Sequence, residues 1–339
     1  MNLFELTRAL VDIESTTSYE QRVADFLFTR LSTLAAHYAG RVERMPVEPN
    51  RDNILAVFER PVVTFSTHMD TVPPFFPSRE DSEFLHGRGS CDAKGIIAAM
   101  IAAAEKLLAS GQRNLGLLFV VGEERDSAGA KVAAKSPRGS QFLINGEPTE
   151  NQLALGSKGG LRFEITAHGR LAHSAYPELG HSAIHELLDV LADLRRIPLP
   201  HDHLLGAATL NIGTISGGRA PNVVADHAQA EIMFRTVGEP EELRRAVLAA
   251  TAGRAEAREV LHTPATRLGA LDGLPTTVVA FATDIPIFNG AWGQPFLIGP
   301  GSIHVAHTAE ERVSKKQLLE AIEIYARIAT QLLAKGATA

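Results

Sequence analysis

The sequence predicts an α/β protein in which a mostly parallel sheet, flanked by helices, is interrupted by a smaller inserted domain. Three short apolar runs, at residues 62–65, 115–121 and 142–145, are separated by stretches with helical periodicity. Apolar strands joined by helices are typical of parallel sheets covered on both faces. From residue 161 onward, apolar and polar residues alternate instead, as in half-exposed strands. This change predicts a second domain of a different type.

The first domain is expected to be built from both ends of the chain. Helices are predicted at residues 3–11, 19–36 (capped by Ser18), 96–110 and 314–333, from their apolar periodicity and caps. Strands are predicted at 53–58 and 295–298, in addition to the three apolar runs, and the chain is expected to return to this domain with residues 276–281. The Pro-rich segment 72–77 can continue neither kind of element, and we expect a loop there.

The inserted domain is predicted to have a ferredoxin-like βαββαβ order. Strands are expected at residues 161–167, 207–215, 228–235 and 259–262, and helices at 181–196 and 239–254. Two βαβ-type halves in this order are the split-βαβ pattern. The predicted division is therefore a first domain at 1–156 and 268–339, with the inserted domain at 157–267.

Composition excludes several classes of protein. Of 339 residues, 45% are hydrophobic and 21% are charged, and the net charge of −6 is spread without basic runs, which argues against a nucleic-acid surface. Cys91 is the only cysteine, so no internal disulfide forms, and we expect it to be a small buried residue. The most apolar helix is too short to cross a bilayer, and the first residues lack a secretory core. These features predict a cytoplasmic protein without a membrane partner.

Polar side chains follow each of the three apolar strands. His68 and Asp70 follow the first, Glu123 and Glu124 the second, and Glu147 the third. Because the carboxyl ends of parallel strands share one edge of a sheet, these groups are expected to converge there. Converging carboxylates repel one another unless a cation is present. Imidazole with carboxylates suits zinc, and also cobalt or manganese, and one carboxylate that bridges two ions is the economical arrangement.

Five motifs in this order resemble a known family. They are residues 67–73 (THMDTVP), 87–95 (GRGSCDAKG), 123–124 (EE), 146–149 (GEPT) and 299–308 (GPGSIHVAHT). The chain is similar to the dinuclear zinc amidohydrolases and metallopeptidases, which include acetylornithine deacetylase, succinyl-diaminopimelate desuccinylase, aminoacylase and glutamate carboxypeptidase. The resemblance covers nearly the whole chain, and it implies a zinc-peptidase-like sheet with an inserted lid domain.

The resemblance also implies a role for each matched residue. His68 and Glu147 are expected to hold one metal ion, Glu124 and His307 the other, with Asp92 bridging them, Asp70 fixing the His68 ring and Glu123 acting as general base on the bridging water. His304 lies in the same turn as His307, and the motif favours His307. Two Zn²⁺ ions per chain are expected, with Co²⁺ or Mn²⁺ as substitutes.

Three residues of the inserted domain are candidates for substrate contacts. In the resembled family, a histidine placed like His173 stabilises the oxyanion, often across a dimer, whereas the alternative is a polar turn residue. Arg235 and Asn222 are expected to bind a substrate carboxylate near each other, although Arg235 could instead form a surface ion pair. The resemblance allows a homodimer through this domain.

The predicted activity is hydrolysis of the amide bond of an N-acyl-amino acid, as in acetylornithine deacetylase. One alternative is a di- or tripeptidase, or a glutamate carboxypeptidase-like enzyme, with the same two ions. A second is an inactive relative that only binds a ligand, against which the complete set of site residues argues. The sequence contains no G-x-S-x-G motif of a serine hydrolase and no phosphate-binding loop.

Overall fold

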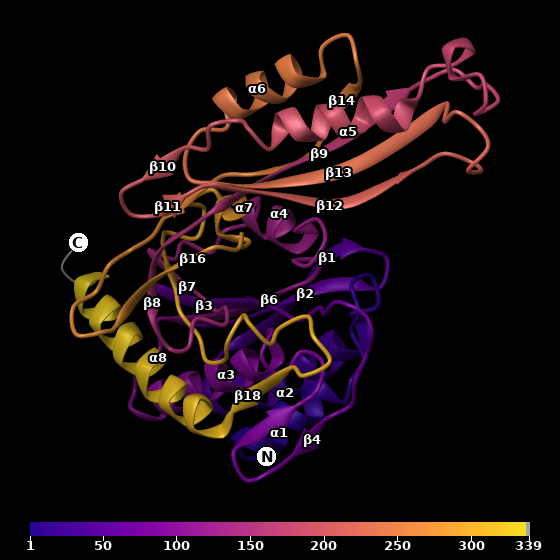
Figure 1. Ribbon diagram of the computed structural model, residues 1–339. Helices are drawn as coiled ribbons and strands as arrows, with labels where there is room; N and C mark the ends of the chain where they lie inside the picture. Colours follow the sequence, from indigo (N-terminus) through magenta and orange to yellow (C-terminus); the bar gives the residue numbers. More distant parts are fainter. Residues whose placement is uncertain (337–339) are drawn as a thin grey trace. The chain divides into compact units, whose positions relative to one another are not determined.

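The computed structural model describes residues 1–336, which form two compact units (Figure 1). Unit 1 contains Met1–Leu155, Leu268–Thr277 and the chain from Thr283 onward, and unit 2 contains Gly156–Arg267 and Val278–Ala282. The short stretch Val278–Ala282 was not expected in unit 2. It is held there because the Lys158 amide donates to the Val279 carbonyl and the Ser157 hydroxyl donates to the Phe281 carbonyl.

The sheet of unit 1 is parallel in its centre and antiparallel at both sides. Its strands run in the order β1 (Arg41–Glu48), β2 (Arg51–Phe58), β6 (Leu115–Val120), β3 (Val63–His68), β7 (Phe142–Asn145) and β17 (Gln294–Leu297). Strands β6, β3, β7 and β17 are parallel, as predicted, whereas β2 pairs antiparallel with β6 and β1 pairs antiparallel with β2. β8 (Leu153–Ser157) pairs antiparallel with β17 and leads out of the unit.

Helices cover both faces of this sheet. The apolar side chains of β2 alternate, so that Ile54 and Ala56 join one cluster and Leu55 and Val57 join another. The first cluster is closed by α1 (Leu3–Val11), α2 (Gln21–Tyr38), α3 (Lys94–Ala109) and α8 (Lys315–Gly336), and the second by α4 (Ala128–Ala134) and α7 (Ile285–Phe288). Burial on both faces explains why these strands read as continuous apolar runs.

Several short elements of unit 1 escaped prediction. These are β1, β4 (Arg79–Glu80), β5 (Phe84–His86), β18 (Arg312–Ser314), α4 and α7. β1 carries four charged residues and a proline, and Met45 is the one buried residue among its eight. α7 has four residues and begins at a proline-containing turn, which is too short for any periodicity. β16 (Thr276–Val279) pairs with β8.

Unit 2 has an antiparallel sheet with the order β12-β13-β9-β14. Its elements are β9 (Gly159–His168), the one-turn helix η1 (Pro177–Leu179), α5 (Ala183–Leu194), β12 (Thr209–Gly217), β13 (His227–Thr236), α6 (Glu241–Thr251) and β14 (Glu256–Thr263). A small hairpin of β10 (His201–Asp202) and β11 (Gly206–Ala207) precedes β12, and β15 (Thr266–Arg267) pairs with the end of β8. Apolar residues of β9 and β13 alternate and pack against α5 and α6. The βαββαβ order with this spatial arrangement is ferredoxin-like, as predicted.

Candidate metal centre and active site

Three parallel strands deliver the polar side chains to one edge of the unit 1 sheet. His68 is the last residue of β3 and lies opposite Val120, the last residue of β6. Glu123 and Glu124 are the third and fourth residues after the end of β6, and Glu147 is the second residue after the end of β7. Because the strands are parallel and in register, the chain segments that follow them start at the same edge. The fourth contribution, Asp92, comes from the turn before α3.

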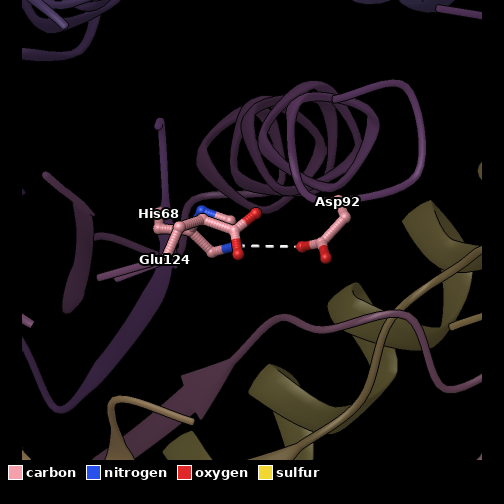
Figure 2. Close-up of side chains that lie close together, drawn as sticks. All are labelled: His68, Asp92 and Glu124. Atoms are coloured by element: carbon pink, nitrogen blue, oxygen red, sulfur yellow. Dashed lines mark hydrogen bonds and ion pairs between the residues drawn. The ribbon is translucent and has the colours of Figure 1, made fainter. Parts of the chain in front are cut away.

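The Asp92 carboxylate lies between two imidazole rings. Nε2 of His68 is 2.9 Å from Oδ1 of Asp92, and Nε2 of His307 is 3.3 Å from Oδ2 of the same carboxylate. Nε2 of His307 is also 3.0 Å from the Glu124 carboxylate. Ligand atoms of His68, Asp92 and Glu124 lie within 4.8 Å of one another (Figure 2). His304, the alternative in the same turn, is exposed and is not part of this cluster.

The pKa values of His68 and His307 are both raised, although the two rings differ in burial. Hydrogen bonds from the half-exposed His307 ring to the carboxylates of Asp92 and Glu124 raise the pKa of His307 to about 10. Burial by itself lowers the pKa of His68, but the carboxylates of Asp70 and Asp92 outweigh burial and raise it well above its ordinary value. Both shifts show that the surroundings of the rings favour positive charge.

The carboxylates around the rings carry more negative charge than the rings can balance. Burial, followed by repulsion from neighbouring carboxylates, raises the pKa of Glu123 and of Glu124. Burial also raises the pKa of Glu147 well above its ordinary value, because the attraction of His68 does not offset it. Carboxylate and imidazole donors with an excess of negative charge are the donor set that divalent ions such as Zn²⁺ take. The residues present therefore fit a cluster of two divalent ions.

Asp70 connects His68 with the segment that carries Glu123 and Glu124. Its Oδ1 accepts the amide hydrogen of Glu123 at 3.1 Å, and its Oδ2 accepts the amide of Glu124 at 3.3 Å and the hydroxyl of Thr17 at 2.8 Å. Nδ1 of His68 lies 3.0 Å from the Asp70 carbonyl oxygen and 3.5 Å from its carboxylate. The ring is thus oriented chiefly by the main chain of Asp70, while the carboxylate holds the Glu123–Glu124 backbone.

Further residues around the centre escaped prediction. Asn53 accepts the Val121 amide hydrogen and donates to the Gly129 carbonyl, so it joins both ends of the Glu123–Glu124 segment. Asp284, the residue before α7, is buried, and burial raises its pKa to about 7. Its charge adds to the repulsion that raises the pKa of Glu123 and Glu147. A polar residue within the apolar strand at 53–58 could have indicated Asn53, whereas no pattern in the sequence connects Asp284 with the site.

His173 and Asn222 are neighbours in unit 2. Val223 forms a β-bridge with His173, and the Ser174 amide donates to the Asn222 carbonyl at 3.0 Å. Both side chains are exposed. Nδ1 of His173 accepts the Ala175 amide hydrogen at 3.1 Å, so the neutral ring carries its proton on Nε2, where it can donate to a ligand.

Arg235 lies at the opposite end of the unit 2 sheet from Asn222. It pairs with Gly160 at the start of β9, whereas Asn222 belongs to the loop before His227, where β13 begins. The eight residue-to-residue steps from His227 to Arg235 span about 26 Å of strand. The expectation that Asn222 lies near Arg235 is therefore wrong within one copy of unit 2. The sequence separation of 13 residues concealed this distance, because most of it is extended strand.

Comparison with known proteins identifies the family. The model of "Peptidase family M20/M25/M40" matches residues 64–331. A Peptidase M20 domain-containing protein of Schizosaccharomyces pombe is 40% identical over 96% of this chain and 84% of its own length. A probable carboxypeptidase of Aspergillus terreus is 39% identical over 95% of this chain and 84% of its own length.

A solved structure shares the fold. The M20 family metallo-carboxypeptidase of Sulfolobus solfataricus superimposes with a TM-score of 0.81 at 14% identity, covering 98% of this chain and 99% of that one. At this identity the likeness shows the fold alone. The family match over residues 64–331 and the 40% identity to a relative establish the family. The chain belongs to peptidase family M20/M25/M40, a family of hydrolases.

Proposed function

We propose that the protein is a metal-dependent hydrolase of amide bonds whose nitrogen belongs to a terminal amino acid with a free carboxylate. The observation that carries this proposal is the position of Asp92, with one oxygen facing His68 and the other facing His307. A carboxylate placed between two imidazoles suits a bridge between two divalent ions. Membership of a peptidase family is consistent with amide hydrolysis.

Each ion has its own set of ligands in this proposal. His68 and Glu147 hold the first ion, Glu124 and His307 hold the second, and Asp92 binds both. When bound, the ions lower the pKa of a coordinated water and polarise the substrate carbonyl. Zinc is the leading candidate from the donor set, with cobalt and manganese as substitutes.

Glu123 is the proposed general base. It is adjacent in sequence to Glu124, and its carboxylate shares the buried cluster with Glu147 and His68. Burial and the nearby Glu147 carboxylate raise its pKa, so bound cations would keep it ionised and ready to accept a proton. Glu123 takes a proton from the attacking water and delivers it to the leaving amine.

Arg235 is the proposed ligand of the substrate carboxylate. Burial lowers the pKa of Arg235, and no carboxylate within residues 1–336 forms an ion pair with it. A partly buried guanidinium without a counter-ion is suited to a bidentate contact with an incoming carboxylate.

His173 and Asn222 are proposed to act on the substrate of a partner chain. A small substrate cannot touch Arg235 and His173 of the same unit 2, because roughly 25 Å of strand separates them. A homodimer in which one chain supplies Arg235 and the other supplies His173 removes this difficulty. His173 would then donate from Nε2 to the developing oxyanion.

The acyl portion of the substrate is proposed to be an amino acid or short peptide. The relatives named above carry the names of peptidases and carboxypeptidases, and carboxypeptidase substrates have the scissile amide and the free carboxylate that the site accommodates. Deacylation of an N-acyl-amino acid such as acetylornithine is the second candidate, since the same two groups are present. A free, buried Cys91 fits the reducing cytoplasm as the location. No helix within residues 1–336 is long and apolar enough to cross a membrane.

A substrate panel tests the proposal. The zinc- and cobalt-loaded proteins are each given dipeptides, tripeptides, N-acetyl- and N-succinyl-amino acids, and the carboxamide of every substrate. We expect a strong preference for the free acid over the carboxamide of each substrate, and a preference for peptides among the free acids. Turnover of acid and carboxamide at equal rates would contradict the role of the free carboxylate. No turnover of any substrate by a protein that holds two ions would favour the inactive, ligand-binding alternative.

A further inference from the structure

Glu311 is a buried carboxylate that contacts the segment leading to Asp92. Its side chain is 2% exposed. Oε1 accepts the amide hydrogens of Gly89 at 2.8 Å, Asp92 at 3.2 Å and Cys91 at 3.3 Å. One carboxylate oxygen therefore accepts three main-chain amide hydrogens of a turn that lies outside any helix or strand.

The other oxygen of Glu311 is held by Arg88. Oε2 lies 2.5 Å from the Arg88 guanidinium, whose Nε also donates to the Pro74 carbonyl at 3.2 Å. Arg88 is 2% exposed, so this ion pair is shielded from solvent. A charged hydrogen bond in such a place fixes geometry more firmly than a neutral one.

The position of Glu311 is itself fixed by the main chain. Its carbonyl accepts the Gly87 amide hydrogen at 3.1 Å. The next residue begins β18, which pairs with β5 through Arg312 and His86. Glu311 also lies four residues after His307, so it ends the segment that brings His307 to Asp92. Two segments of the site, distant in sequence, meet at this one carboxylate.

We propose that Glu311 is a positioning residue that holds the Asp92 turn and the His307 segment in the arrangement required for the two metal ions. It touches neither substrate nor ion. This inference rests on the proposed function, because it takes Asp92 and His307 to be ligands. Outer residues that orient metal ligands typically contribute 10–100-fold to metal affinity.

Glu311→Gln is the variant that tests this role. The amide is nearly the same size, so no cavity forms. Its single carbonyl oxygen can still face the three amide hydrogens, but its NH₂ group then faces the Arg88 guanidinium, donor against donor. We expect a loss of about 10–100-fold in Co²⁺ and Zn²⁺ affinity, measured by calorimetric titration of the metal-free full chain.

The matched control is Glu43→Gln. Glu43 also accepts from two arginines, Arg138 at 2.7 Å and Arg41 at 2.8 Å, but it lies on β1 away from the strand ends that form the site. This variant should leave metal affinity unchanged. The visible absorption of bound Co²⁺, which reports ligand geometry, should change in Glu311→Gln and stay the same in Glu43→Gln. A purely structural ion pair at Glu311 would not alter that spectrum.

The outcomes separate this inference from the proposed function. A wild-type protein that takes up no divalent ions contradicts the proposed function. Two ions bound by wild type, with a loss below about tenfold and an unchanged Co²⁺ spectrum in Glu311→Gln, contradict only the inference. If Glu311→Gln does not fold, hydrogen exchange of the metal-free wild type tests whether the Asp92 turn is held in place without metal. Slow exchange at the amides of Gly89, Cys91 and Asp92 supports the preset turn, and exchange as fast as in exposed loops overturns it.

Discussion

The proposed metal ligands of unit 1 and the proposed substrate contacts of unit 2 are built in opposite ways. His68, Asp92 and Glu147 are 1%, 5% and 4% exposed, and carboxylates or imidazoles surround them. His173 and Asn222 are exposed, and Arg235 has no counter-ion within the described chain. The side chains of unit 1 are already held in place by their neighbours without a bound ion. The side chains of unit 2 remain available for contact with a substrate.

This contrast follows from what each group binds. An ion is small and is held by several ligands at once, so the ligands must stand in place and the main chain must hold them there. A substrate carboxylate or oxyanion needs only one or two donors, which can remain exposed to water beforehand. Changes in unit 1 should therefore affect metal content or the chemical step, and changes in unit 2 should affect turnover with metal content intact.

The largest expected effect within unit 1 comes from Glu123→Gln. Removal of the general base should lower kcat by about 10²–10⁴-fold, while both ions remain bound because Glu123 is not a ligand. Steady-state kinetics with elemental analysis measure both quantities. Glu124→Gln is the matched control, since it should lose metal as well as activity. A near-normal kcat in Glu123→Gln would assign the base to another residue.

The next largest effect is expected from His173→Ala in unit 2. Loss of one oxyanion donor should lower kcat by about 10²–10³-fold with unchanged metal content. Heterodimers of His173→Ala with Glu123→Gln chains test the trans arrangement, because one of their two sites would have both intact residues. Recovery of part of the activity is the expected result. Verified heterodimers without any recovery would show that each chain supplies its own His173.

A smaller effect is expected from Arg235→Lys. Lysine keeps the charge but not the two parallel donors, and a lost charged hydrogen bond is worth about 1.5–3 kcal/mol, or roughly one to two decades in kcat/KM. The loss should appear for a free-acid substrate and not for its carboxamide. If kcat/KM of the variant decreases equally for the acid and the carboxamide, Arg235 does not bind the substrate carboxylate.

The smallest effect concerns the stability of the metal-free protein. The raised pKa values of Glu123 and Glu147 mean that their ionisation destabilises the folded state as pH rises above their ordinary range near 4.5. Protonated His307, with its pKa raised from 6.5 to about 10, stabilises the fold fully below 6.5 and loses this contribution as pH approaches 10. The two glutamates and His307 therefore all stabilise the folded state less as the pH rises.

The thermal midpoint of the metal-free protein should therefore decrease as the pH rises from about 5 to about 9. Zinc should reduce this dependence, because ligands must be deprotonated to bind it and its charge compensates the carboxylates. Scanning calorimetry at several pH values, with zinc and with a chelator, is the measurement. The Glu43→Gln variant, altered far from the centre, should follow the wild-type profile. A midpoint of the metal-free protein that rises with pH would contradict the electrostatic account of the centre.

The sequence by itself determined the local features of both units. Apolar runs buried on both faces gave the parallel strands β3, β6 and β7, and the polar residues after them identified His68, Glu123, Glu124 and Glu147. Alternation in β9 and β13 gave the antiparallel sheet of unit 2. These features were predictable because strand burial depends on a pattern of neighbours in the chain, and because parallel strands end at one edge.

Only the tertiary structure decided which distant residues meet. Glu311 reaches the Asp92 turn across 219 residues, and Asn53 reaches Val121 across 68. Asp284 adds its charge to the centre from the position just before α7, a helix too short to have a pattern. Asn222 and Arg235, near in sequence, are separated by the length of β13. Periodicity reports which face of an element is buried, but not the partner against which it packs, and the partner is chosen by the packing of the whole chain.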